Sequence, residues 1–241
     1  MKKISFLLMC LFAILTASCS KEDEPAQEKL DTKNIQFYIE DTRTITLENA
    51  TGSVVWKSDN PLIASVVANG NKCTITAEHV GTTIIKANNH ICEVKVLPKY
   101  TFFKEPYFKF GGSMSDVKKY MSWASLKEST STSLGYFYDD LNTAYLYTFE
   151  NGALDISSFA TTLSNASDVI DYLLERYIPV TEIDTYTYGC LNPEKTMLVV
   201  IQLGDYLTVA YTEYNSSKSS YEEDINIMAK KLDSIKECIK F

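Results

Sequence analysis

Histidine is scarce in this chain of 241 residues, which contains only His79 and His90. Both lie in the first half, so the second half lacks the commonest general base and any Ser-His-Asp or Cys-His arrangement. The sequence also has no glycine-rich phosphate-binding loop and no dinucleotide fingerprint. Neighbouring carboxylates occur at Asp139 and Asp140, but they separate two expected strands and predict a turn, whereas a glycosidase needs two carboxylates across a cleft. We expect no enzymatic activity and keep a hydrolase as an alternative.

Metal ligands and positive charge are scarce as well. His90 lies two residues from Cys92, but a zinc site needs three or four converging ligands, so we expect no metal and no cofactor. Asp and Glu number 31 against 23 Lys and Arg, which gives a formal net charge of -8. Because nucleic-acid binding relies on clustered Lys and Arg, this charge argues against a nucleic-acid partner.

Long apolar runs are missing except at the N-terminus. A basic start precedes Ile4–Ala13, which is mostly apolar but too short to span a bilayer as a helix. The small residues Ala17 and Ser18 then precede Cys19, and this stretch resembles the lipobox of bacterial lipoproteins. The resemblance implies a signal peptide at 1–18 that is removed on export. It also implies lipidation of Cys19, whose two or three acyl chains would hold the protein stably in a membrane.

The leader departs from the lipobox pattern at one place. Lipoboxes usually carry leucine three residues before the cysteine, but Thr16 holds that place and the leucine is Leu15, a looseness common in Bacteroidetes-like lipoproteins. An ordinary cleaved signal or an uncleaved anchor is the alternative. Residues 19–33 are expected to form the lipidated cysteine and an acidic linker. Residues 20–24 resemble an acidic signal for display on the outer face of the outer membrane, with a plain solvated linker as the alternative.

Residues 34–98 consist of short alternating or β-branched runs separated by turn residues. About seven such runs with regular punctuation predict a β-sandwich. The expected strands are Ile35–Ile39, Thr44–Leu47, Val54–Trp56, Ala64–Val66, Cys73–Ala77, Thr82–Ala87 and Cys92–Val96.

The order of landmarks within this region carries a resemblance. Trp56 is followed by an Asn60-Pro61 turn, an Asn69-Gly70 turn and Gly81 before the last strands. This succession resembles the bacterial Ig-like domain of group 2 (Big_2), a module of adhesins and surface lipoproteins. Trp56 supplies core area, and Asn69-Gly70 accepts the positive φ of a tight hairpin. The resemblance implies a spacer or a binding face, and we expect a spacer.

Four cysteines remain beyond Cys19. One pair per domain, Cys73 with Cys92 and Cys190 with Cys238, could form disulfides in an exported protein. Free buried thiols are the open alternative.

Residues 99–241 form the second expected domain. Lys99–Gly112 is aromatic and irregular, and it is expected to pack as a strand or plug between the domains. Residues 219–240 have an apolar side and an acidic first turn, which predicts a C-terminal helix that closes against a sheet.

The region between these segments repeats itself. Ser115 and the residues after it recur from Ser167, and Tyr136 falls on Tyr188 at the same offset of 52 residues. Each unit predicts a helix, with apolar residues at i, i+3 and i+4, followed by three strands. The two expected units are about 113–160 and 165–214.

An α-β-β-β unit used twice can build one continuous antiparallel sheet with helices on one face and the other face open. This arrangement resembles the tandem repeat of β-lactamase-inhibitor-like proteins, although the chain has no inhibitor motif at the level of residues. The expected fold is therefore multidomain, with an all-β Ig-like sandwich followed by an α+β domain.

Strand alternation separates the two faces of the expected sheet. Tyr145, Tyr147 and Phe149 point to one face, which is expected to be core. The opposite face is expected to be half exposed and suited to contact with a protein or glycan. The candidate ligand-binding residues on or near it are Leu146, Leu198, Tyr206 and Tyr214.

Three functions fit these features. The favoured one is a non-enzymatic lipoprotein, anchored in the outer membrane and displayed at the cell surface, whose repeat domain binds a protein or glycan. The second is a periplasm-facing inhibitor or assembly factor of β-lactamase-inhibitor-like type. The third is a hydrolase.

Overall fold

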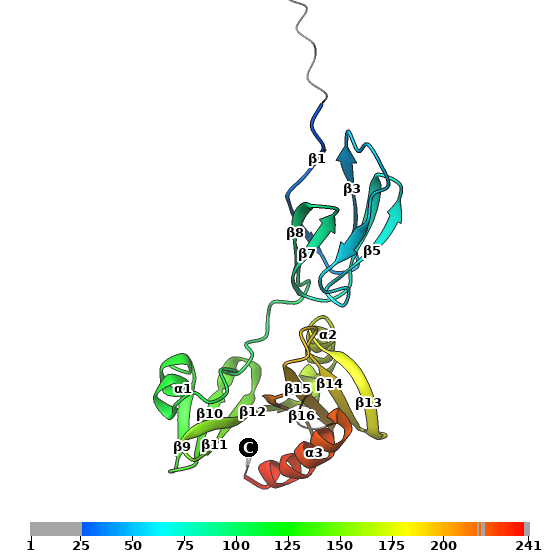
Figure 1. Cartoon of the computed structure of the whole chain (residues 1–241). Coiled ribbons are helices and arrows are strands. Elements are labelled where there is room, and N and C mark those ends of the chain that lie inside the picture. The colour runs from blue at the N-terminus through cyan, green and yellow to red at the C-terminus, as the bar shows by residue number, and fades with distance from the viewer. Residues whose placement is uncertain (1–25, 216, 218–219, 239–241) are drawn as a thin grey trace, which may run out of the picture.

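The computed structural model describes residues 26–215, 217 and 220–238, with side chains up to Lys231. The predicted signal peptide at 1–18 and Cys19 lie outside the described residues. The described chain is rich in β-structure and contains three sheets in two modules (Figure 1). No helix in the described part is both long and apolar enough to cross a membrane.

The first module, here the sandwich module (residues 29–97), consists of two four-stranded sheets. One sheet has the order β1-β3-β6-β5 and the other β2-β8-β7-β4, with β2 and β8 parallel. Alternate side chains of both sheets, such as Ile75 and Val94, point into a shared core and have no exposed surface. The strands are β1 (Lys29–Leu30), β2 (Asn34–Tyr38), β3 (Thr42–Glu48), β4 (Trp56–Ser58), β5 (Ala64–Asn69), β6 (Lys72–Ala77), β7 (Gly81–Ala87) and β8 (His90–Leu97).

The seven strands expected in this region are present. The largest shift is at β4, which begins at Trp56 and continues to Ser58, where the sequence predicted Val54–Trp56. Gly70 has a φ of +59° in the β5–β6 hairpin, as expected for a tight turn. The Trp56 ring nitrogen donates a hydrogen bond to the Gly70 carbonyl at 3.1 Å, so this turn also satisfies the buried indole.

The cysteines of the sandwich module are free thiols, so the suggested Cys73–Cys92 disulfide is wrong and the alternative of free buried thiols holds for this pair. Both side chains are fully buried and act as small apolar residues of the core. Burial raises the pKa of both thiols to about 11. Cys190 is also a buried free thiol in the second module, and the side chain of Cys238 lies outside those described.

The second module, here the sheet module (residues 99–238), is built on one eight-stranded antiparallel sheet with the order β13-β14-β15-β16-β12-β11-β10-β9. The strands are β9 (Ser125–Ser129), β10 (Ser133–Tyr138), β11 (Thr143–Glu150), β12 (Ala153–Thr162), β13 (Ile178–Asp184), β14 (Thr187–Leu191), β15 (Met197–Leu203) and β16 (Tyr206–Glu213). The helices are α1 (Met114–Tyr120), α2 (Ala166–Leu174) and α3 (Tyr221–Cys238).

The repeat is visible in how the two halves meet. The last strands of the units, β12 and β16, pair antiparallel, and Ser158 faces Ala210, which lies 52 residues later. Equivalent residues face one another in this way when two halves are related by a twofold rotation. The other strands of the two units are shifted by two residues relative to the offset of 52. Phe159 pairs with Tyr145, which in turn pairs with Tyr136. Its equivalent Tyr211 pairs with Val199, which in turn pairs with Cys190. The structural equivalent of Tyr136 is therefore Cys190 and not Tyr188. Tyr136 and Cys190 lie on the same face of the sheet.

Each repeat unit has four strands where the sequence predicted three. The additional strands are β9 and β13, and they form the two edges of the sheet. The five residues of β9 are mostly polar and all exposed, and β13 contains Pro179, which cannot donate a backbone hydrogen bond. Neither strand therefore shows the apolar pattern of a buried strand.

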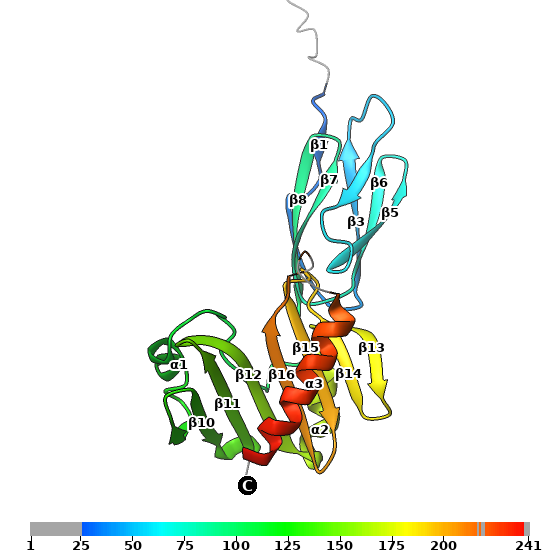
Figure 2. The same cartoon turned by 60° about the horizontal axis from the view of Figure 1, so that its bottom comes forward.

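The faces of the sheet are covered differently. The first face, which carries Tyr145 and Val199, packs against Val117 of α1 and Val169 of α2. Helix α3 lies on the second face, across β14, β15 and β16 (Figure 2). The expectation of helices on one face only is therefore wrong, because the apolar side of α3 buries Leu198 and its neighbours on the opposite face.

The aromatic segment before α1 packs as a plug on the first face. Phe103 packs against Phe159 with ring centroids 4.6 Å apart, and it meets Tyr172 of α2 edge to face. The Tyr145 hydroxyl donates a hydrogen bond to the Lys104 carbonyl at 2.7 Å. Burial raises the pKa of the Glu105 carboxyl, which accepts a hydrogen bond from the Tyr177 hydroxyl at 2.7 Å. The plug therefore joins the sheet to α2 through apolar and polar contacts.

The carboxylate of Glu175, directly after α2, ties the two modules together. It accepts hydrogen bonds from the backbone N–H groups of Lys99 at 2.9 Å and Tyr100 at 3.2 Å, at the connection between the modules. The Glu175 carbonyl also accepts a hydrogen bond at 2.8 Å from Val80 of the sandwich module. A further bond runs from the Asn60 amide of the sandwich module to the Pro193 carbonyl at 3.0 Å. The junction is thus held by directed hydrogen bonds.

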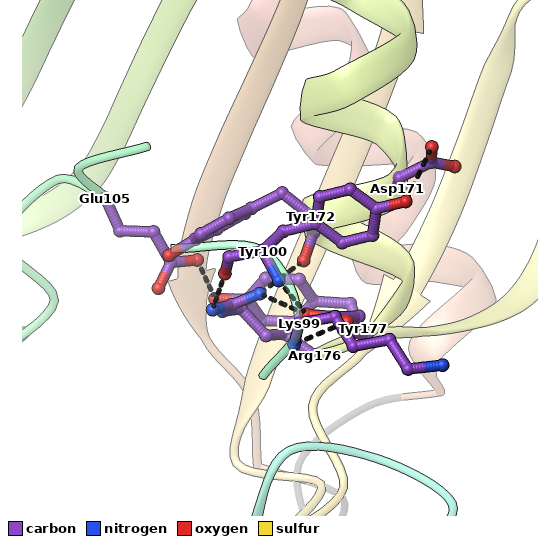
Figure 3. Close-up of polar contacts among 8 residues, drawn as sticks. Lys99, Tyr100, Glu105, Asp171, Tyr172, Arg176 and Tyr177 are labelled. Carbon is purple, nitrogen blue, oxygen red and sulfur yellow. Dashed lines mark hydrogen bonds and ion pairs between the residues drawn. The ribbon is translucent and has the colours of Figure 1, made fainter. Parts of the chain in front are cut away.

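Arg176 completes this junction (Figure 3). Its guanidinium donates to the carbonyls of Tyr172 at 2.7 Å and Tyr100 at 2.9 Å, and it pairs with the Glu175 carboxylate at 3.3 Å. The same group stacks on the Tyr172 ring, 3.5 Å from its centroid. Lys99 adds an ion pair to Glu40 of the sandwich module.

Candidate functional site

The second face of the sheet is only partly covered by α3. Ile225 and Met228 of the helix are buried against Leu198, Val200 and neighbouring side chains. Gly189 of β14 lets the helix approach closely, because a Cβ atom at that position would lie 2.3 Å from the Ile225 Cδ1 atom. The helix is thereby seated over β14–β16, and β10 and β11 lie beside it in Figure 2.

A groove of about 590 Å³ lies on this less covered half of the second face, and we call it the acidic groove. It contains side chains from β9, from the β10–β12 strands and from α3. A smaller hollow of about 260 Å³ adjoins it and shares Ile156 and Lys231 with it. The lining residues of the groove are Glu128, Thr132, Ser133, Leu146, Thr148, Phe149, Glu150, Asp155, Ile156 and Lys231.

A β-bulge shapes the groove. Thr148 of β11 pairs with Ile156 of β12, but the next residue, Phe149, pairs with Leu154, so Asp155 has no partner in the ladder. The Asp155 carboxylate meets the Lys231 ammonium of α3 at 3.1 Å. The bulge therefore supplies an ion pair that joins the edge of the groove to the helix.

The groove has apolar side chains beneath a mainly acidic wall. Leu146 and Ile156 are largely buried, whereas Glu128 and Glu150 are exposed at its edges. Lys231 is the single cation among the described lining residues, and its charge is engaged by Asp155. The groove thus carries net negative charge at a concave surface, which concentrates cationic groups.

The described lining of the groove offers apolar contacts and charged groups. Its described lining residues include no histidine and no cysteine. The Ser133 hydroxyl is bonded to the Thr130 hydroxyl at 2.7 Å and not to a base. Throughout the described residues, no three His, Cys, Asp or Glu side chains are arranged to hold a metal ion.

The structure separates the four residues that the sequence placed in the ligand site. Leu146 lies in the groove. Leu198 and Tyr214 are buried in the core beneath α3, with 0% and 8% of their surface exposed. Tyr206 is half-buried at the start of β16 and lies outside the groove. The structure therefore does not bring these four residues together into one site.

Sequence reasoning missed the charged residues of the groove. Glu128 belongs to a strand that was not predicted, Asp155 is the extra residue of a bulge, and Lys231 comes from a helix whose face of contact was unknown. The only sequence signal was the alternation that put Leu146 and Thr148 on the same side of β11.

Comparison with known proteins gives no family for the chain. No family model matches it, and no curated protein matches. Among solved structures, domains 5–6 of the S-layer protein SbsC match at 13% identity over 80% of this chain and 85% of that chain, with a TM-score of 0.25. Domains 4–9 of the surface layer protein SbsC match at 14% identity over 80% of this chain and 27% of that chain, with a TM-score of 0.26. Scores this low carry no argument about function.

Proposed function

We propose that this protein is a lipid-anchored binding protein of the outer membrane, displayed at the cell surface and without enzymatic activity. The observation that carries the proposal is the acidic groove, a concave surface with apolar and charged side chains on the sheet module. Ligand sites in proteins are typically concave, with apolar linings and a few polar groups. The ligand is a protein or a glycan.

The sandwich module serves as a bacterial Ig-like spacer in this proposal. Its apolar side chains are used between its own two sheets, which supports a structural role. The hydrogen bonds of Glu175 and Asn60 to the neighbouring module support a fixed orientation of the two modules. An anchored spacer joined in this way would hold the groove away from the membrane.

Membrane attachment through Cys19 is the first prediction. Replacing Cys19 with alanine removes the thiol that would carry the lipid, so the protein should move from the detergent phase to the aqueous phase or remain as precursor. Phase partitioning of cell extracts measures this, with Cys190→Ala as the matched control because that thiol is buried within the sheet module. Unchanged partitioning of Cys19→Ala would contradict the anchor.

A periplasm-facing inhibitor of β-lactamase-inhibitor-like type is the second candidate. The continuous eight-stranded sheet built from two repeat units favours it. Protease treatment of intact cells separates the two candidates, because a displayed protein is cut and a periplasmic one is protected. Survival of the protein while known surface proteins are cut would remove the surface proposal.

Binding itself is tested by probing the mature chain, without its lipid, against arrays of glycans and peptides. We expect retention of at least one class of ligand without its chemical turnover. Cleavage of an arrayed glycan or peptide would support the hydrolase alternative instead.

A further inference from the structure

We propose that the acidic groove takes a cationic amphipathic peptide segment, in which Lys or Arg side chains alternate with apolar ones. This inference rests on the proposed binding function and names the chemistry of the partner. It follows from the charge around the groove, from the apolar side chains in it, and from the ligand classes that this combination disfavours.

The carboxylates around the groove greatly outnumber its cations. Among the residues that the structure describes there, five carboxylates line the groove and the adjoining hollow, against one cation, Lys231. Lys231 is already paired with Asp155 at 3.1 Å, so it contributes little attraction for an anionic ligand. Electrostatic complementarity between partners speeds association and suppresses partners of the wrong charge. The five are Glu128, Glu150, Asp155, Glu213 and Asp224.

Apolar side chains lie between these carboxylates. Leu146 and Ile156 line the groove, and Ile227 of α3 is 48% exposed in the adjoining hollow. A ligand that carried charge alone would leave this apolar surface uncovered. A segment with basic side chains on one side and apolar ones on the other satisfies both features.

Other ligand classes fit the groove less well. Sulfated glycans, nucleic acids and anionic lipid headgroups would meet the carboxylates with like charge. Neutral glycans need exposed aromatic faces for stacking, but Phe149, the one aromatic residue of the described lining, is only 5% exposed and belongs to the core of the first face. The exposed rings of Tyr186 and Tyr188 are on β14 or just before it, and β14 is separated from β11 by three strands of the sheet.

The test uses the mature chain and a fluorescent peptide of twelve alternating Lys and Leu residues. Fluorescence anisotropy should show saturable binding that weakens with added salt. The substitutions Glu128→Lys and Glu150→Lys together should reduce the affinity by about tenfold or more, because both exposed carboxylates become repulsive. The pair Glu128→Gln and Glu150→Gln, which removes charge without reversing it, should give a smaller loss and covers the case in which the lysine variant does not fold.

A matched control pair changes the total charge of the chain by the same amount as the two lysine substitutions in the groove. The pair Glu182→Lys and Asp205→Lys changes exposed carboxylates outside the groove and should leave the affinity within about twofold. An equal loss from the control pair, or equal binding of a peptide of alternating Ser and Leu, would overturn the inference. If a neutral or anionic ligand binds in the groove instead, the cationic partner is wrong and the binding function stands. If groove substitutions affect no ligand, both are wrong.

Discussion

Replacing Glu175 with alanine should lower the free energy of unfolding of the sheet module by about 3 kcal/mol, because it removes a buried carboxylate that pairs with the Arg176 guanidinium and accepts hydrogen bonds from two backbone N–H groups. The Glu175 side chain is 6% exposed and that of Arg176 is 13% exposed. The N–H groups of Lys99 and Tyr100 would lose the carboxylate that now accepts from both. Thermal and urea denaturation of the mature chain measures the loss.

The control for this prediction is Glu182→Ala. Glu182 is an exposed carboxylate on β13, and its removal should change the stability by no more than about 0.5 kcal/mol. If Glu175→Ala were as mild as this control, the junction would not depend on the carboxylate.

Replacing Gly189 with valine should displace α3 from the second face. The new Cβ atom would lie 2.3 Å from Ile225 Cδ1 and 2.9 Å from its Cγ1, so the whole Ile225 side chain would have to move. Overpacking of this kind costs about 1 to 3 kcal/mol, and we expect the upper end because Ile225 is fully buried. Urea denaturation gives the cost, and hydrogen exchange across α3 shows whether the helix is the part released.

A double substitution tests whether the clash is the cause. Ile225→Ala alone leaves a cavity and should also destabilise the protein, by about 2 to 5 kcal/mol. In the combined variant the valine at position 189 can fill part of that cavity, so its cost should be less than the sum of the two single costs. Strict additivity would mean that Gly189 and Ile225 do not constrain each other.

Much of the β-structure could be predicted from local sequence. In the sheet module, alternating apolar residues gave the strands from β10 to β12 and from β14 to β16. Asn151 and Gly152 both have positive φ in the β11–β12 hairpin, as the Asn-Gly pair predicts. These features depend on residues that are close in the sequence, so they can be predicted without knowledge of the fold.

The remaining features depend on partners far away in the sequence. The polar residues of β9 and the proline of β13 give no strand signal in the sequence. Both edge strands are defined only by their pairing with a neighbouring strand. The apolar side of α3 shows that the helix packs against something, but it does not specify a face of the sheet. The close approach at Gly189 decides this, and from sequence alone a glycine within a strand can equally mark a bulge or a tight bend.

The same limit explains what the sequence shows of the candidate site. Alternation correctly grouped Leu146 with Leu198 on one face, since both belong to the same apolar cluster. It could not show that α3 covers Leu198 while Leu146 also lines the groove. The acidic wall arises from a bulge, an edge strand and a distant helix, so no contiguous motif encodes it.

Locating ligand binding on the chain distinguishes the acidic groove from the sandwich module as the recognition surface. Arrays of glycans and peptides should be probed with three mature chains, namely the unmodified one, Thr148→Trp and Val67→Glu. Thr148 lines the groove, where an indole would fill the space, whereas Val67 is 67% exposed on the sandwich module. We expect Thr148→Trp to lose about tenfold or more of the affinity for the retained ligand and Val67→Glu to keep it. Loss of binding in Val67→Glu with full binding in Thr148→Trp would rule out the groove as the binding site and assign recognition to the sandwich module.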